Sequence, residues 1–266
     1  MTGHSANLST HTEKQQHTNM KKTLLIAAAA LAASVISSQA QVYSQNIVGY
    51  ANVPTTSSGT PYLITVPFKI GVTNGANEVF GNTLPSGSSL LLWNGLGYNT
   101  VIYDNSDPAG FGTSVVWYAG DDATPVNPPL LPTGKGFFLV PNGPVTNTFA
   151  GTVSVNVGTS NILSLPSSGT PYLVSSVVPY AGAVTNGTSS TGGPNLNNLP
   201  TGSSLLIWNG LGYNTVIYDN SDPAGFGTSV VWYAGDDATP VPVPTITVGQ
   251  GFFVVPNGAY NWTTGL

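Results

Sequence analysis

The side chains of this sequence that could do chemistry are aspartates and aromatic rings, and both occur in two copies. The aspartates are Asp104, Asp107, Asp121 and Asp122, which recur at the same spacing as Asp219, Asp222, Asp236 and Asp237. Two carboxylates can hydrolyse a glycosidic bond when one of them has a raised pKa in a cleft. Carboxylate oxygens are also the ligands that Ca²⁺ prefers. The aspartates therefore admit acid hydrolysis, calcium binding or a purely structural role.

The local sequence favours the structural role. The aspartates lie in Asp-Asn-Ser-Asp-Pro and Gly-Asp-Asp segments, where an aspartate typically accepts hydrogen bonds from backbone N–H groups in a turn. Calcium binding is the next alternative, although the spacing is not that of an EF-hand loop. Its candidate ligands are Asp104, Asp107 and Asp121 in the first copy and Asp219, Asp222 and Asp236 in the second. Glycoside hydrolysis ranks last.

Aromatic side chains form the second candidate site. Trp117 and Tyr118 are adjacent, so they point to opposite faces of a strand, and one of them is expected to be exposed or covered by a loop. Exposed rings of this kind stack against sugar rings or protein surfaces; the alternative is ordinary core and cross-strand packing. The candidate ligand-binding residues are Tyr103, Phe111, Trp117 and Tyr118, repeated as Tyr218, Phe226, Trp232 and Tyr233.

The residue types that the chain lacks exclude most enzyme mechanisms. Beyond residue 40 there is no His, Cys, Met or Arg, and the only side-chain cations are Lys69 and Lys135. Catalytic Ser–His–Asp or Cys–His arrangements and zinc sites built on Cys and His are therefore impossible there. Two lysines against nine acidic side chains leave no electrostatic footprint for nucleic acid. We predict a protein that is not an enzyme and that needs no cofactor, calcium being the one possible exception.

The elements that carry these residues belong to a tandem repeat. Residues 93–126 recur without a change at 208–241, and the flanking SSGTPYL and GxGFF segments also return in order. Such internal repeats are the first pattern to settle in a sequence, and each unit is about 110 residues, a common domain size. We divide the chain into residues 1–40, an upstream segment plus signal peptide, residues 41–153, the first β unit, and residues 154–266, the second.

The pattern within each unit is that of β-strands. Short runs of β-branched and aromatic residues are bounded by Gly, Pro, Asn and Asp, and no stretch keeps a 3.6-residue apolar period. The turn Asn94–Gly97 contains two glycines and predicts a tight hairpin that brings Trp93 near Tyr98. The sequence therefore predicts an all-β protein of two tandem β-sandwich or barrel-like domains of similar sequence.

An export signal precedes the first unit. Lys21 and Lys22 are followed by an apolar run at 24–36 and by Ser38-Gln39-Ala40, which is typical of a secretory signal peptide cleaved after Ala40. An uncleaved N-terminal anchor is the alternative. Residues 1–19 are interpreted as an upstream mis-start or a tag. We expect a mature protein outside the cytoplasm, in the periplasm, at the cell surface or in the medium, without a membrane anchor and without disulfides.

Several short motifs occur in a characteristic order. They are the opening QVYSQNIVGYANV at 41–53, the WNGLGY hairpin, YLVSSVVPYAG at 172–182, the GKGFF and GQGFF strands, and Trp262. In these the chain resembles a group of uncharacterised exported bacterial all-β tandem-repeat proteins. The resemblance implies a secreted repeat protein and implies no known activity. The chain stops at Leu266, soon after Trp262, so the final strand is expected to be short.

Three classes of function compete. The first is a non-enzymatic structural or adhesive protein of a cell surface or matrix, which we rank first. The second is a carbohydrate-binding protein with a duplicated aromatic and aspartate site, assisted by calcium, and the third is a secreted acid glycoside hydrolase. The corresponding partners are polysaccharides, other surface proteins or further copies of the chain. Exposed aromatic strips would favour the second class, a cleft with two close buried carboxylates the third, and open strand edges the first.

Overall fold

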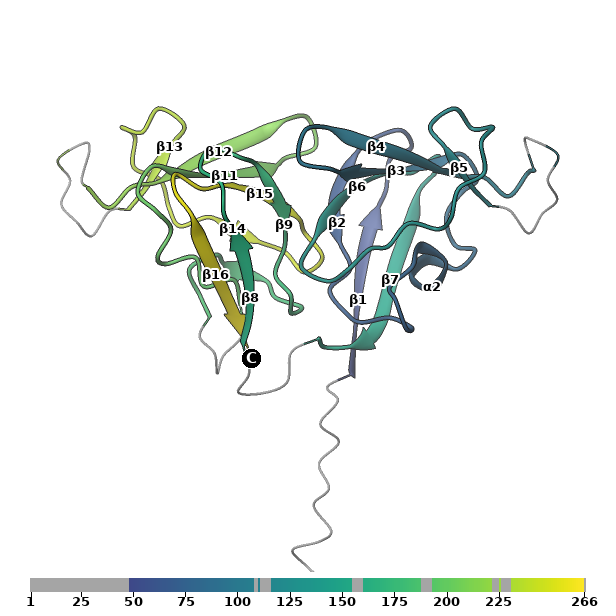
Figure 1. Cartoon of the computed structure of the whole chain (residues 1–266), viewed down its shortest axis with the longest axis horizontal. Coiled ribbons are helices and arrows are strands. Elements are labelled where there is room, and N and C mark those ends of the chain that lie inside the picture. The colour runs from purple at the N-terminus through teal and green to yellow at the C-terminus, as the bar shows by residue number, and fades with distance from the viewer. Residues whose placement is uncertain are drawn as a thin grey trace, which may run out of the picture. The chain divides into compact units, whose positions relative to one another are not determined.

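The computed structural model describes residues 48–107, 110, 116–154, 160–187, 193–221, 225 and 231–265. Within these residues nearly all regular structure is β, arranged in several antiparallel sheets with one short helix (Figure 1). The prediction of an all-β protein is therefore confirmed. The expected upstream segment and signal peptide, residues 1–40, lie outside the described residues.

The first repeat consists of a five-stranded sheet and a two-stranded ribbon. The sheet has the order β2 (Tyr62–Thr65), β6 (Gly136–Val140), β3 (Ser88–Trp93), β4 (Tyr98–Tyr103) and β5 (Trp117–Ala119). The ribbon pairs β1 (Val48–Thr55) with β7 (Val145–Thr152) along their whole length, and the two strands lie side by side in Figure 1.

The second repeat has the same strand order. Its sheet runs β9 (Tyr172–Val174), β15 (Phe252–Val255), β11 (Ser203–Trp208), β12 (Tyr213–Tyr218) and β13 (Trp232–Ala234). Its ribbon pairs β8 (Ser160–Leu165) with β16 (Tyr260–Gly265), and a further short pair joins β10 (Gly182–Ala183) to β14 (Thr245–Ile246). Residues 46–266 belong to one compact unit; the expected domain boundary at residues 153 and 154 stays a prediction.

The core of each repeat lies between its sheet and its ribbon. In the first repeat, Ala51 and Phe149 of the ribbon belong to the same buried cluster as Leu90 and Phe137 of the sheet. In the second repeat, Trp262 of β16 is buried in the equivalent cluster. Each ribbon therefore contributes one face to a core and turns the other face outward, as period-2 strands require.

The hairpin predicted at Asn94–Gly97 joins β3 to β4. The backbone N–H of Asn94 donates to the carbonyl of Gly97 at 3.0 Å, and the Asn94 side-chain oxygen accepts from the N–H groups of Leu96 and Gly97. Gly95 has a φ of 102°, which a side chain would disfavour. Trp93 is directly opposite Tyr98 in the register, and Asn209–Gly212 repeats this arrangement in the second unit.

The short helix α2 (Ala76–Phe80) was not predicted. Five residues are too few to establish a helical period in the sequence. The loop before the helix is organised by Glu78, whose carboxylate accepts from the backbone N–H groups of Val72, Thr73 and Gly75 at 2.9–3.1 Å. These backbone bonds, those from Val72 and Thr73 first, lower the pKa of Glu78 to about 2.

We expect Glu78→Gln to lower the thermal stability of the protein at pH 7, because an amide accepts these hydrogen bonds more weakly than a carboxylate. A carboxyl group whose pKa is lowered by folding stabilises the native state above its ordinary pKa and loses that contribution as the pH falls toward 2. The difference in melting temperature between wild type and variant should therefore narrow between about pH 4.5 and pH 2. A constant difference over that range would show that the carboxylate charge is not responsible.

Candidate functional site

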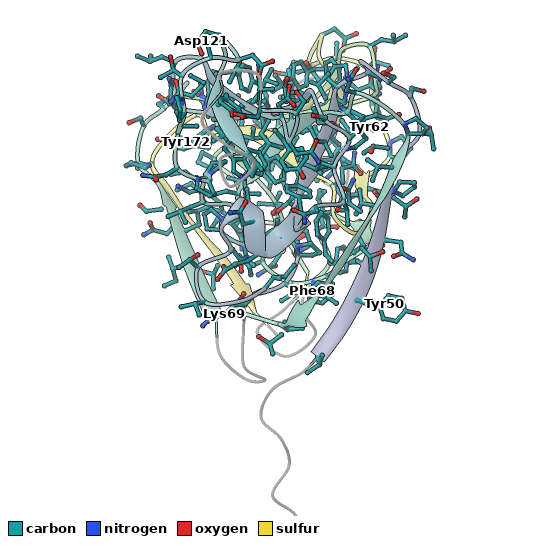
Figure 2. All side chains as sticks on the ribbon, turned by 90° about the vertical axis from the view of Figure 1, so that its right-hand side faces the viewer. Tyr50, Tyr62, Phe68, Lys69, Asp121 and Tyr172 are labelled. Atoms are coloured by element: carbon teal, nitrogen blue, oxygen red, sulfur yellow. The ribbon has the colours of Figure 1, made fainter. Side chains whose placement is uncertain are left out.

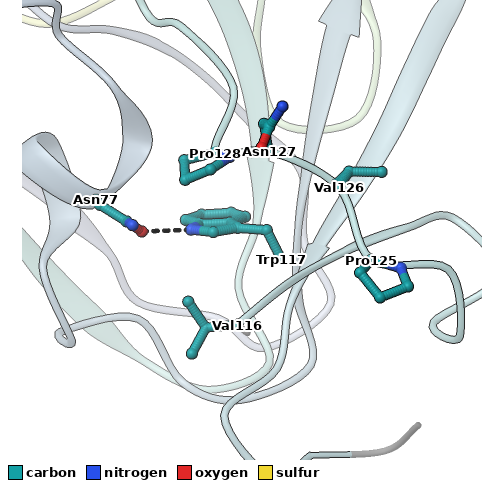
Figure 3. Close-up of a pocket in the computed structure, with 7 residues that line it drawn as sticks. All are labelled: Asn77, Val116, Trp117, Pro125, Val126, Asn127 and Pro128. Carbon is teal, nitrogen blue, oxygen red and sulfur yellow. Dashed lines mark hydrogen bonds between the residues drawn. The ribbon is translucent and has the colours of Figure 1, made fainter. Parts of the chain in front are cut away.

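The sequence-predicted aromatic residue Trp117 lies at the wall of a pocket in the first repeat (Figure 3). The pocket has a volume of about 580 Å³ and is lined by Asn77, Val116, Trp117, Pro125, Val126, Asn127 and Pro128. The Trp117 indole N–H donates to the side-chain oxygen of Asn77 on α2 at 2.5 Å. The ring also packs edge to face on Tyr103, with centroids 5.2 Å apart, and the residue is only 1% exposed.

Both rings of the Trp117–Tyr118 pair are buried, so neither face of β5 is open to solvent. Tyr118 is fully buried, and Tyr103 is buried as well. Of the two outcomes expected for this pair, an exposed ring or a covered ring, the structure therefore has the covered ring. Burial, followed by the nearby Asp107, Asp104 and Asp122, raises the pKa of Tyr118. A ring enclosed in this way presents no face on which a sugar could stack.

The second repeat buries the equivalent rings. Tyr218, Trp232 and Tyr233 are all buried, and the Tyr218 hydroxyl donates to the carbonyl of Asn197 at 2.7 Å. Trp232 differs from Trp117 in one respect: its indole N–H is buried without a hydrogen-bond acceptor among the described residues. Phe111 and Phe226, the remaining predicted aromatic residues, lie outside the described part of the chain.

Four of the aspartates act as turn-forming acceptors, as the local sequence favoured. Asp121 accepts from the N–H groups of Ala123 and Thr124 and from the Thr124 hydroxyl, and Asp236 does the same in its repeat. The bond from the Thr124 hydroxyl and then the backbone bonds lower the pKa of Asp121 to about 2. Asp104 accepts from the Ser106 N–H and the Ser86 hydroxyl. Asp219 accepts from the N–H and the hydroxyl of Ser221.

The other described aspartates have one buried oxygen each. The Oδ1 atoms of Asp107, Asp122 and Asp237 are buried without a hydrogen-bond partner, and all three residues have a positive φ of 54–60°. Within the described residues no group of three His, Cys, Asp or Glu side chains is placed to hold a metal ion. Asp222 lies outside these residues. The predicted calcium site therefore stays a prediction, with Asp121 and Asp236 committed to their own turns.

The sequence did not predict the site at which the two repeats meet. The indole N–H of Trp93 donates to the carbonyl of Pro171 at 3.0 Å, and that of Trp208 donates to Pro61 at 2.9 Å. Since Trp208 is the repeat of Trp93 and Pro171 that of Pro61, the contact is reciprocal. Four buried side chains lie in the centre of this contact, which we call the repeat interface: Leu63, Phe138, Leu173 and Phe253.

The aromatic contacts of the repeat interface are reciprocal as well. Trp93 packs edge to face on Phe253 with centroids 5.3 Å apart, and Trp208 packs on Phe138 at 5.1 Å. The hydroxyls of Tyr98 and Tyr213 are 3.4 Å apart. Burial first, then the hydrogen bond with Tyr213, raises the pKa of Tyr98.

A groove borders the repeat interface, and we call it the neutral groove. It has a volume of about 580 Å³ and contains Asn52 and Tyr62 of the first repeat together with Trp208, Thr247 and Gln250 of the second. None of the described residues that line it carries a charge. The positions equivalent to Asn52 and Gln250 are Ile162 and Lys135, which line a smaller cavity of about 210 Å³ with Leu163 and Trp262.

The fold and these contacts define an all-β protein whose two sequence repeats pack on each other reciprocally. No protein-family model, no curated protein and no solved structure matches the chain. The resemblance to exported repeat proteins therefore stays a prediction. In the described portion of the chain, no helix is both long and apolar enough to cross a membrane.

The two tryptophans provide an internal comparison of a satisfied and an unsatisfied indole N–H. We expect Trp117→Phe to destabilise the protein more than Trp232→Phe, by about 0.5–1.5 kcal/mol, because only Trp117 loses a hydrogen bond. Urea unfolding of the two variants measures this difference. In a protein that already carries Asn77→Ala, Trp117→Phe and Trp232→Phe should cost nearly the same, because the indole of Trp117 has then lost its acceptor. With Asn77 in place, equal costs for the two phenylalanine variants would contradict the assigned bond.

Proposed function

We propose that this chain is an exported, non-enzymatic structural or adhesive protein of a cell surface or extracellular matrix. The observation that carries the proposal is the use of its reactive side chains inside the fold. The sequence-predicted rings that the structure describes are buried, namely Tyr103, Trp117, Tyr118, Tyr218, Trp232 and Tyr233. Four aspartates, Asp104, Asp121, Asp219 and Asp236, accept hydrogen bonds within their own turns. The threonine hydroxyl and then the backbone bonds lower the pKa of Asp121 and of Asp236 to about 2. Burial raises the pKa of Asp122 and Asp237, but neither lines the pocket beside Trp117, the neutral groove or the smaller cavity. This arrangement does not favour glycoside hydrolysis, which requires a carboxyl group with a raised pKa in a cleft.

The outer surface of the ribbons supports an adhesive role. Val48 and Tyr50 on β1 are 71% and 74% exposed, and Ile162 on β8 is 68% exposed; Figure 2 shows Tyr50 projecting away from the ribbon. Among the described strands, each ribbon is a sheet of two strands. β1 and β8 therefore each present an edge that can pair with a further strand. Exposed rings and strand edges are both features through which proteins bind surfaces.

A strain that lacks this chain is expected to lose attachment to surfaces or to neighbouring cells, and re-expression of the full chain should restore it. Biomass retained after washing measures the effect. The matched control is re-expression without residues 1–40, which should stay inside the cell and restore nothing. Unchanged attachment in the deletion strain would contradict the adhesive role, and restoration by the truncated chain would contradict the need for export.

Carbohydrate binding is the second candidate function, and the neutral groove favours it. Its amides, the Thr247 hydroxyl and the aromatic rings of Tyr62 and Trp208 are the groups that neutral sugars contact. The site of this second candidate is therefore the groove and not the buried rings around Trp117. The equivalent position in the other half of the molecule does not repeat the chemistry of the groove, because Ile162 stands there in place of Asn52 and Lys135 in place of Gln250.

On this second candidate, the double variant Asn52→Ala/Gln250→Ala should bind an insoluble neutral polysaccharide about tenfold more weakly, as the loss of one or two hydrogen bonds implies. Pull-down depletion curves measure the affinity. The matched control is Ile162→Ala/Lys135→Ala at the equivalent positions, which should bind like the wild type. Equal binding by both double variants would remove the groove from consideration.

A further inference from the structure

The repeat interface has the geometry of a symmetric dimer built from one chain. In an isologous interface, if a residue of one subunit contacts a second residue on its partner, the reverse contact also occurs. Backbone bonds obey this rule here: Thr65 N–H donates to Gly249 at 2.9 Å, and Ser175 N–H, at the equivalent position, donates to Gly134 at 3.0 Å. The hydroxyls of Thr65 and Ser175 themselves meet at 2.8 Å.

The side chains in the centre of the interface are the same in the two repeats. The central pairs are identical in the two repeats: Trp93 and Trp208, Tyr98 and Tyr213, Phe138 and Phe253, Leu63 and Leu173, and Pro61 and Pro171. Gly136 and Gly251 are also equivalent, and a Cβ on Gly251 would lie 3.3 Å from the Gly136 Cα. A first repeat from another molecule would therefore offer nearly the same surface as the second repeat of the same molecule.

We propose that this interface also takes a second copy of the chain, with the first repeat of one molecule pairing with the first repeat of another, and the second with the second. Each chain carries two such self-complementary surfaces, so an opened chain can close with one partner into a dimer or continue into a linear assembly. Pairing within one chain dominates in dilute solution, because a short connection gives an effective concentration of about 1 mM. Pairing between chains competes when the local concentration approaches that value. The inference rests on the interface alone, and its failure would leave the proposed function standing.

Thr65 provides a direct test, because its partner differs between the two modes of pairing. Within one chain it faces Ser175, whereas in a contact between two first repeats it faces Thr65 of the other molecule. Its side chain is buried, so a thiol there is shielded from random collision. The chain has no native cysteine, and the hydroxyls of Thr65 and Ser175 are 2.8 Å apart, so cysteines at these two positions test whether the pair can form a disulfide.

The experiment uses Thr65→Cys in the chain from residue 41 onward, unfolded and refolded under reducing conditions at about 1 µM and at about 1 mM, which bracket the effective concentration. The samples are then diluted to one common concentration, oxidised and quenched, so that non-reducing electrophoresis measures the covalent dimer and light scattering the mass of the assemblies. We expect severalfold more dimer after refolding at the higher concentration. Ser175→Cys should behave in the same way, and it keeps the test valid if Thr65→Cys does not fold.

Two matched variants complete the design. Thr65→Cys/Ser175→Cys should form a disulfide within one chain after dilute refolding, which verifies the geometry of the pair. Thr146→Cys, at an exposed position of β7, measures crosslinking by random collision. Its yield of covalent dimer should not depend on the refolding concentration. The proposal is overturned if Thr65→Cys and Ser175→Cys give no more dimer than Thr146→Cys while the double variant closes within the chain.

Discussion

The reciprocal packing of Trp93 and Trp208 across the repeat interface is the constraint on which the arrangement of both repeats depends. Each indole N–H is satisfied by a carbonyl of the other repeat, and each ring packs on a phenylalanine of the other repeat. A buried indole N–H without an acceptor is costly, and edge-to-face aromatic pairs add to the free energy of area burial. Each repeat therefore provides the acceptor that the tryptophan of the other repeat uses.

The same interface closes the edges of the two large sheets. β2 and β9 are the terminal strands of their sheets, and open terminal strands are sites of unwanted association. Here Ile64 forms a bridge with Gln250 and Val174 forms one with Lys135, so each terminal strand is capped by the turn before the GFF strand of the other repeat. A chain without disulfides and with few charges thus protects two of its strand edges by pairing its own repeats.

What could be predicted from the sequence was local. The hairpin at Asn94–Gly97 and the turn role of Asp121 depend on neighbouring residues, and both were correctly anticipated. The sequence did not settle whether Tyr118 is exposed or covered, because alternation assigns one face of a strand to solvent only when that face is uncovered. The repeat interface was not predicted either, since its contacts join residues 78 to 147 positions apart, and nothing in the spacing indicates that the repeats pair with each other.

The positions at which the two repeats are identical are used mainly by the fold, whereas several positions at which they differ lie in the grooves. The identical block supplies buried rings, aspartate turns and the tryptophans of the interface, all of which the fold itself uses. Some of the differences lie where side chains reach the grooves, with Asn52 and Gln250 on one side and Ile162 and Lys135 on the other. Duplication of the block therefore says little about how many ligands the chain binds. Any chemical distinction between the two halves of the molecule must come from residues outside the identical block, and these groove residues are among them.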